Sequence, residues 1–235
     1  MRHLTLARRR PASWPPARVV VARYAVAWAY LAGFVLAEII YTILPTHDQF
    51  LVLHWASTDV VNLHQHPIGS LVVSAFIAQG FPLAWPALIA LALFGANRVL
   101  GNWRTAVLCA TGHVVGTLVS EGIVAYRTAH GLLPEAANRI LDVGPSYVVV
   151  SAITVAVLFG SWPARAAAVA DLALLVFVGD IFGGLSTLQV AAVGHATAIA
   201  VSVPLGTLLA RQARQRRPPP GFRAVAAPDV PDPRR

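Results

Sequence analysis

Two short strings in this sequence carry residues that could act together as a nucleophile and a base. Gly144-Pro-Ser146 and Gly194-His195 lie near the ends of two separate apolar stretches. A serine hydroxyl becomes a nucleophile when a neutral histidine accepts its proton, and desolvation in a membrane keeps a histidine neutral. If the two strings meet inside a membrane, serine-dependent acyl transfer is the leading hypothesis.

The residues around the serine predict that it lies at the start of a helix. Proline is favoured at the first helical position, so Pro145 places Gly144 near the cap and Ser146 in the opening turn. The first N–H groups of a helix lack internal partners and carry the positive end of the helix dipole. The amides of Ser146 and Tyr147 are therefore expected to hold the oxyanion of an acyl-transfer reaction.

The predicted depths of Ser146 and His195 in the membrane are similar. A helix over residues 145–160 rises only about 24 Å, which is less than a hydrocarbon core of about 30 Å, so it starts below the surface. His195 lies about seven residues into a span predicted at 188–209, roughly 10 Å down. Ser146 and His195 are thus expected at similar depths.

Composition sets the class of protein that must position these residues. The chain is 57% hydrophobic and only 12% charged over 235 residues, so a soluble domain would lack polar surface. Backbone groups in lipid must be paired internally, and the long continuous apolar runs suit helices better than barrel strands. The sequence therefore predicts an all-α polytopic membrane protein.

Six membrane-spanning helices are predicted, with an interfacial segment after the first. The interfacial stretch at 51–79 is apolar but interrupted by histidine, aspartate and asparagine. The spans are expected at residues 19–44, 83–100, 104–126, 145–160, 164–178 and 188–209.

Arginine placement predicts the orientation of these spans and the division of the chain. Five arginines lie in residues 1–18 and five in residues 211–223. Cytoplasmic segments carry the excess of positive charge, so both ends are expected in the cytoplasm of a cell-membrane protein. We expect a basic segment at 1–18, a membrane domain at 19–210 and a disordered Pro/Arg-rich tail at 211–235. The basic ends are expected to contact anionic lipid head groups, and no nucleic-acid partner is expected.

Between His66 and Leu209 the chain resembles the rhomboid family of intramembrane serine proteases. Gly144-Pro-Ser146 is similar to the family's serine motif at the head of its fourth core helix, and Gly194-His195 to the histidine of its sixth. Three weaker strings are similar to its interfacial loop and second helix: Ser74-Ala-Phe, Phe94-Gly and Leu100-Gly-Asn-Trp-Arg104. The resemblance implies a six-helix core, a Ser/His dyad without aspartate or cofactor, and cleavage of transmembrane or membrane-proximal substrates near small residues.

Two departures from the family pattern concern the oxyanion. The family's His-x-x-x-Asn pair on the second helix aligns with Leu83 and Ala87, while an alternative placement uses His66 and Ser70. Tyr147 stands where the serine motif has glycine. These changes leave the helix amides as the evident oxyanion donors, with His113 as a possible aid.

Other polar residues in apolar stretches have two interpretations each. His113, within the GxxxG string 112–116, either supports close helix packing or donates a hydrogen bond near Ser146. Glu38, Glu121 and Asp171 mark either proton paths or bonds between helices. The histidines at 54, 64 and 66 suggest a metal site only weakly, because the pair His64-x-His66 lies in a flexible loop without an evident third ligand, and we expect no metal.

Three hypotheses follow from these patterns. The first is the intramembrane serine protease with Ser146 and His195. The second is an inactive rhomboid-like protein that binds transmembrane partners. The third is a proton-coupled transporter using Glu38, His113, Asp171 and His195, but the two halves of the chain lack the similarity expected of inverted repeats.

Overall fold

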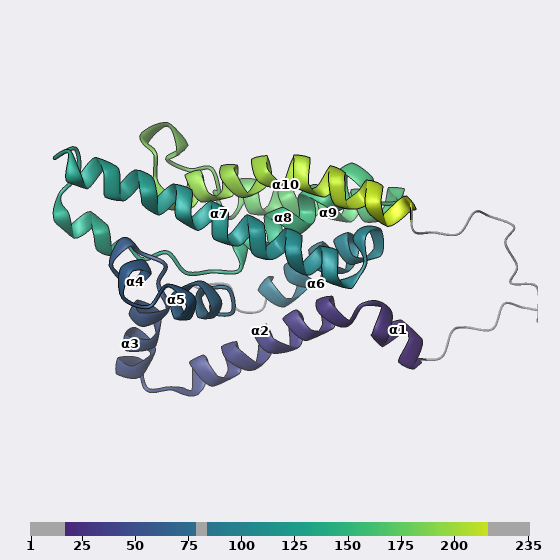
Figure 1. Ribbon diagram of the computed structural model, residues 1–235. Coiled ribbons are helices and arrows are strands. Elements are labelled where there is room, and N and C mark those ends of the chain that lie inside the picture. The colour runs from purple at the N-terminus through teal and green to yellow at the C-terminus, as the bar shows by residue number, and fades with distance from the viewer. Residues whose placement is uncertain (1–16, 79–83, 216–235) are drawn as a thin grey trace, which may run out of the picture.

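The computed structural model describes residues 17–78 and 84–215. Within these ranges every regular element is a helix, and the helices form an elongated bundle (Figure 1). The all-helical class predicted from composition is confirmed for the described part of the chain. The tails at 1–16 and 216–235, where most of the terminal arginines were counted, lie outside the described residues.

Helices occupy most of the described residues in the six predicted spans and in the interfacial segment. The helices are α1 (Ala17–Arg23), α2 (Ala25–Ile43), α3 (Thr46–Ala56), α4 (Val60–Gln65), α5 (Pro67–Ser74), α6 (Ala84–Leu100), α7 (Asn102–Ala129), α8 (Ser146–Phe159), α9 (Trp162–Phe177) and α10 (Val190–Gln215), with short 3₁₀ turns η1 (Glu135–Arg139) and η2 (Leu185–Thr187).

Three of these helices are long and apolar enough to cross a membrane by themselves, namely α2, α7 and α10. Helices α6 and α8 are apolar but shorter. Length and composition therefore support a membrane protein with several spans. The count of six spans stays a prediction.

Helix α8 is the centre of the bundle, because α6, α7, α9 and α10 all pack against it. Every residue from 147 to 156 is buried. A helix that is apolar on nearly all sides is typical of a protein core or a membrane span, and α8 is buried among the other helices. Its 14 residues rise about 21 Å, so it is shorter than a hydrocarbon core of about 30 Å.

Small residues bring α7 and α10 into close contact, as the sequence predicted. A Cβ on Gly116 would lie 3.0 Å from the carbonyl oxygen of Gly194 and 3.5 Å from the Cβ of Ala198. On the α8 side, a Cβ on Gly112 would collide with the Ser151 hydroxyl. Both glycines of the GxxxG string thus serve close helix packing.

The first predicted helix is broken into two, which the sequence analysis did not anticipate. Tyr24 leaves helical geometry with φ −118° and ψ 28° between α1 and α2. Two asparagine side chains from around the α6–α7 junction bond carbonyl groups near the break: Asn97 donates to Arg23 and Asn102 to Ala22, each over 2.8 Å. Carbonyl groups freed by the break are therefore paired by distant side chains.

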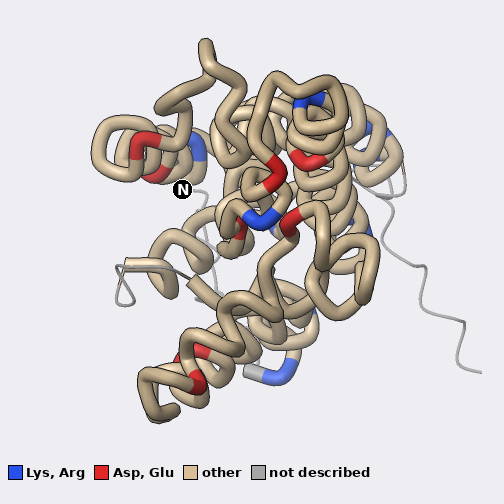
Figure 2. The backbone as a smooth tube through the Cα atoms, turned by 90° about the vertical axis from the view of Figure 1, so that its left-hand side faces the viewer, with Lys and Arg blue, Asp and Glu red and all other residues tan. Residues whose placement is uncertain are grey.

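Charge is divided between the two ends of the bundle. Figure 2 looks onto the end where α7 finishes and α8 and α10 begin, and several acidic positions are visible there. At the other end most of the described arginines lie near helix termini: Arg18, Arg23, Arg98, Arg104, Arg165, Arg211 and Arg214. Positive charge is usually in excess on the cytoplasmic side of a membrane protein, so this distribution agrees with the prediction that the arginine-rich end is cytoplasmic.

Candidate active site

Ser146 is the first residue of α8, and Pro145 is its N-cap, one position earlier than the sequence predicted for the proline. The first hydrogen bond of this helix runs from the Val149 N–H to the Pro145 carbonyl over 3.0 Å. The N–H groups of Ser146, Tyr147 and Val148 therefore have no acceptor within the helix. The half-buried Ser146 hydroxyl thus lies beside a group of free backbone donors.

His195 lies on α10 and is almost fully buried, with 4% of its surface exposed. Its Nδ1 lies 2.9 Å from the carbonyl oxygen of Ile181, which precedes α10 in the α9–α10 loop. A carbonyl can only accept, so Nδ1 carries a proton and, in the neutral ring, Nε2 is the acceptor. Nε2 is buried and has no hydrogen-bond partner among the described residues.

Tyr147 connects the serine-bearing turn to His195. Its ring meets the His195 ring edge to face, with centroids 4.9 Å apart, and a Cβ on Gly194 would collide with it. The Tyr147 hydroxyl donates to a carboxylate oxygen of Asp142 at 3.2 Å and lies 3.5 Å from the Val190 carbonyl oxygen. The aromatic ring that replaces the family's glycine is therefore fixed at both ends.

The two predicted catalytic side chains are not hydrogen-bonded to each other. Within the described part of the chain, no bond joins the Ser146 hydroxyl to the His195 ring. The contact between their two helices at this point is made instead by Tyr147, the residue after the serine. Catalytic hydrogen bonds are often long in enzymes without substrate, so this geometry leaves the dyad as a prediction.

Asp142 belongs to the site, although the sequence analysis assigned it no role. Its carboxylate accepts from the hydroxyls of Tyr147 and Thr58, and its carbonyl accepts from the Thr58 N–H over 2.9 Å. The pKa of Asp142 is raised to about 6, chiefly by burial; the hydrogen bonds from the Thr58 and Tyr147 hydroxyls lower this pKa, and the nearby charge of Asp59 raises it. The signal available in the sequence was its place in the string Asp142-Val-Gly-Pro-Ser-Tyr147.

His113 ties α7 to α5 and is not bonded to the serine turn directly. Its Nε2 lies 2.9 Å from the Leu71 carbonyl oxygen and 3.3 Å from the Ser74 hydroxyl. The Ser74 carbonyl in turn accepts from the N–H of Gly144 over 3.1 Å. The bond to a neighbouring carbonyl matches the packing interpretation, and the chain through Ser74 brings His113 near the start of α8.

The three other acidic candidates differ in their pairing. Glu38 on α2 accepts from the Ala78 N–H over 2.6 Å, so it links α2 to the end of the interfacial segment. The carboxylate oxygens of Glu121 and Asp171 are buried without hydrogen-bond partners among the described residues. These three residues lie on three different helices.

The histidines of the interfacial segment bond backbone carbonyls. His54 and His64 each bond the carbonyl four residues earlier, and His66 bonds the Trp55 carbonyl while its ring stacks on the Trp55 ring at 4.9 Å. Within residues 17–78 and 84–215, no three His, Cys, Asp or Glu side chains are grouped as metal ligands.

The positions considered for the family's oxyanion pair fall in two places. Ala87 lies in the first turn of α6, while Leu83 is outside the described residues. In the alternative placement, the buried Ser70 donates to the backbone carbonyl oxygens of His66 and Pro67. Neither placement supplies a donor pair that the structure joins to Ser146.

Comparison with known protein families places most of this chain in one of them. A family described as "Rhomboid-like protein" matches residues 19–215, which is more than half of the chain. No curated protein and no solved structure matches the chain significantly.

Proposed function

Because the chain belongs to the rhomboid-like family, we propose that it is an intramembrane serine protease in which Ser146 and His195 act as a catalytic dyad. The observation that carries the proposal is the state of the His195 ring. Its Nδ1–H is bonded to the Ile181 carbonyl, which leaves Nε2 as a buried lone pair without a partner. A buried acceptor is costly unless something donates to it, and the serine hydroxyl is the donor that the chemistry requires.

The proposed reaction is a two-step acyl transfer. The Ser146 hydroxyl attacks the carbonyl carbon of the scissile peptide bond while Nε2 of His195 accepts its proton. Nε2 then gives that proton to the leaving amine, and an acyl-enzyme remains on Ser146. Water attacks this ester with the same histidine as base, which frees the new carboxyl end and restores the serine. The Ile181 carbonyl holds the ring in the tautomer that both steps need.

The oxyanion of each step would be held by the free amides of the first turn of α8. These amides belong to Ser146, Tyr147 and Val148, and the positive end of the helix dipole adds to their effect. Each such donor is worth about a factor of 100 to 1000 in turnover. A chain without the family's second-helix pair is therefore expected to turn over slowly.

The substrate class follows from where the site lies. Ser146 is half-buried at the start of a short central helix, so a reacting peptide bond must reach it from within or close to the membrane. We propose transmembrane or membrane-proximal segments as substrates. A peptide bond in a membrane helix is shielded by its own hydrogen bonds, and small residues ease the local unwinding that exposes it. The proposed location is the cell membrane, with both termini in the cytoplasm.

Labelling by a fluorophosphonate tests the dyad directly, because the probe reacts covalently with an activated serine. Purified full-length protein in a neutral detergent is expected to be labelled, and both Ser146→Ala and His195→Ala are expected to lose the label. Ser151→Ala is the matched control, since Ser151 lies on the same helix and its hydroxyl is bonded to the Tyr147 carbonyl over 2.7 Å. Labelling that survives Ser146→Ala contradicts the proposal.

The second candidate function is an inactive membrane protein that binds transmembrane partners. The observation that favours it is the absence of a Ser146–His195 bond in the described residues, together with the fixed Tyr147 ring at the glycine position of the motif. A folded wild-type protein that takes up no fluorophosphonate and cleaves no membrane-segment peptide would support this candidate over the protease.

A further inference from the structure

A cavity at the arginine-rich end of the bundle lies far along the helices from the serine and histidine. It has a volume of about 300 Å³ and lies between the end of α1, the end of α6, the α8–α9 turn and the end of α10. This is far more than the space that one water molecule needs. The cavity is therefore large enough for a small polar group.

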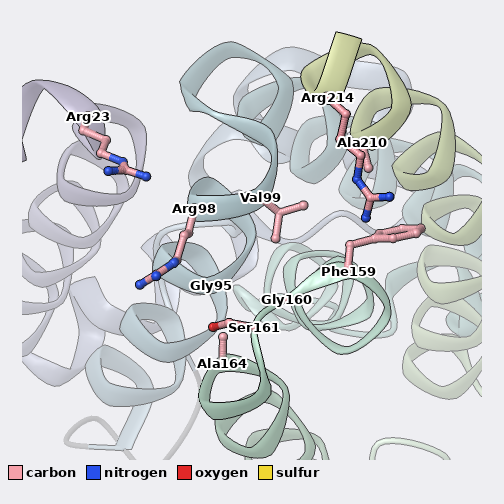
Figure 3. A pocket seen from close by; sticks show the side chains of 10 residues that line it. All are labelled: Arg23, Gly95, Arg98, Val99, Phe159, Gly160, Ser161, Ala164, Ala210 and Arg214. Atoms are coloured by element: carbon pink, nitrogen blue, oxygen red, sulfur yellow. The ribbon is translucent and has the colours of Figure 1, made fainter. Parts of the chain in front are cut away.

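Three arginines from three different helices line this cavity: Arg23 of α1, Arg98 of α6 and Arg214 of α10. In Figure 3 the Arg23 and Arg98 side chains lie towards one end of the cavity, and Arg214 lies towards the other, above Phe159. No acidic residue is among the described residues that line it. With three arginines and no carboxylate in its described lining, the cavity favours an anion over a cation.

The first turn of α9 adds uncharged donors to the same cavity. Ser161 is the N-cap of this 16-residue helix, and its side chain makes no capping hydrogen bond. The first helical bond runs from the Arg165 N–H to the Ser161 carbonyl, so the N–H groups of Trp162 and Ala164 have no acceptor within the helix. Ser161 and Ala164 both line the cavity. Free amides at a helix N-terminus, next to arginines, suit a phosphate group.

The rest of the lining is apolar or small. Gly95, Val99, Phe159, Gly160 and Ala210 form these walls. Polar groups form most of the accessible lining, so the position of the cavity decides between a lipid and a free ion. The cavity lies at the arginine-rich end of the bundle, where positive charge is expected to meet anionic lipid head groups. A phosphate that belongs to a membrane lipid is therefore the occupant that this position favours.

We infer that this cavity is a binding site for the head group of an anionic membrane phospholipid, which would lie among Arg23, Arg98 and Arg214. Arginine can bind phosphate through two parallel N–H donors. A charge that only attracts the membrane surface does not need this geometry. The site differs from the diffuse contact expected of the basic ends, because its three arginines come from separate helices and line one cavity within the described bundle. It is independent of the proposed proteolysis, since none of its residues belongs to the serine or histidine turns.

The test counts lipids bound to the purified full-length protein by native mass spectrometry. Phosphatidylglycerol is compared with phosphatidylcholine carrying the same acyl chains, and inorganic phosphate is added as a competitor in a third arm. We expect one phosphatidylglycerol to bind in preference to phosphatidylcholine and to resist millimolar phosphate. Equal binding of the two lipids overturns the inference. Displacement of the lipid by inorganic phosphate at the same concentration also overturns it, because the site would then bind a free anion equally well.

Arginine variants separate a built site from a general surface charge. Arg98→Gln/Arg214→Gln is expected to weaken phosphatidylglycerol binding about 10-fold to 100-fold, the effect of losing charge-assisted hydrogen bonds. The matched control is Arg18→Gln/Arg211→Gln, which removes the same charge from two exposed arginines at the same end but outside the cavity lining. The control should change phosphatidylglycerol binding less than about 3-fold, because salt screens exposed charges that do not contact the lipid.

Equal weakening by the two double variants would mean a diffuse field and would overturn the discrete site. If the cavity variant fails to fold, as judged by thermal unfolding, the single Arg214→Gln replaces it, because Arg214 is exposed in the last turn of α10. Its expected loss of phosphatidylglycerol binding is at least about 5-fold. Unchanged binding in that variant also overturns the inference.

Discussion

Replacing Gly194 by alanine tests the packing that links the serine turn to the histidine. A Cβ at this position would collide with the ring and hydroxyl of Tyr147. Tyr147 is only 3% exposed, its hydroxyl is bonded to Asp142 and its ring packs against the His195 ring, so the ring has little room to move. Inserting atoms into a well-packed core costs about 1–3 kcal/mol. Gly194→Ala should therefore lower the free energy of unfolding by that amount.

The matched control is Gly122→Ala on α7. A Cβ on Gly122 would meet nothing within 4 Å, so only the backbone effect remains. Alanine is better than glycine in a helix by about 0.5–1 kcal/mol, so this variant should be neutral or slightly stabilised. Reversible unfolding of full-length protein in mixed detergent micelles measures both. The difference between the two variants is expected to be about 1–4 kcal/mol.

A double-mutant cycle identifies the partner in the collision. Tyr147→Ala removes the ring and should itself cost about 3–5 kcal/mol through the cavity it leaves. Once the ring is gone, the alanine at position 194 meets no obstacle, so the pair should cost less than the sum by about 1–3 kcal/mol. Effects that add within about 0.5 kcal/mol would refute the proposed contact, as would equal stability of Gly194→Ala and Gly122→Ala.

Three further predictions concern neighbouring parts of the structure. Burial is the main reason that the pKa of Asp142 rises from 3.8 to about 6, so the folded state favours the protonated carboxyl. The free energy of unfolding should therefore be highest below about pH 4 and should fall by up to about 3 kcal/mol as the pH rises through 6. Unfolding measured from pH 4 to 7 should show this decline in the wild type, and a decline of the same size in Asp142→Asn would contradict it. Glu38→Ala should cost about 1–3 kcal/mol because the buried Ala78 N–H loses its acceptor, whereas Glu38→Gln keeps an acceptor and should cost clearly less in the same unfolding assay. Gly112→Ala should cost about 1–3 kcal/mol because its Cβ would meet the Ser151 hydroxyl, and wild-type stability in that variant would show that the helices can move apart.

Properties that depend on a short stretch of chain could be predicted from the sequence. Residues 83–100, for example, were expected to be helical, and α6 occupies Ala84–Leu100. A continuous apolar run in lipid has few alternatives to a helix, because its backbone groups must pair within the segment. The GxxxG string similarly predicted a close helix crossing, since only small side chains allow two backbones to approach.

Features made by residues distant in the sequence could not be predicted in this way. The break at Tyr24 is accompanied by hydrogen bonds from Asn97 and Asn102, more than 70 positions away. The tautomer of His195 likewise depends on a carbonyl of the α9–α10 loop, at Ile181. A backbone carbonyl exists at every residue, so the sequence contains no signal for the one that the ring will bond.

The sequence by itself determined that this is an apolar helical membrane chain, that a serine begins one helix and a histidine lies near the start of another, and that arginine is concentrated towards the ends. Those properties follow from composition and from spacing within single helices. Only the tertiary structure decided that Tyr147 and Asp142 contact each other beside His195, and that three arginines from α1, α6 and α10 share one cavity. The reason is physical: helix formation depends on interactions within about four residues, whereas which side chains meet depends on how every helix packs against the others.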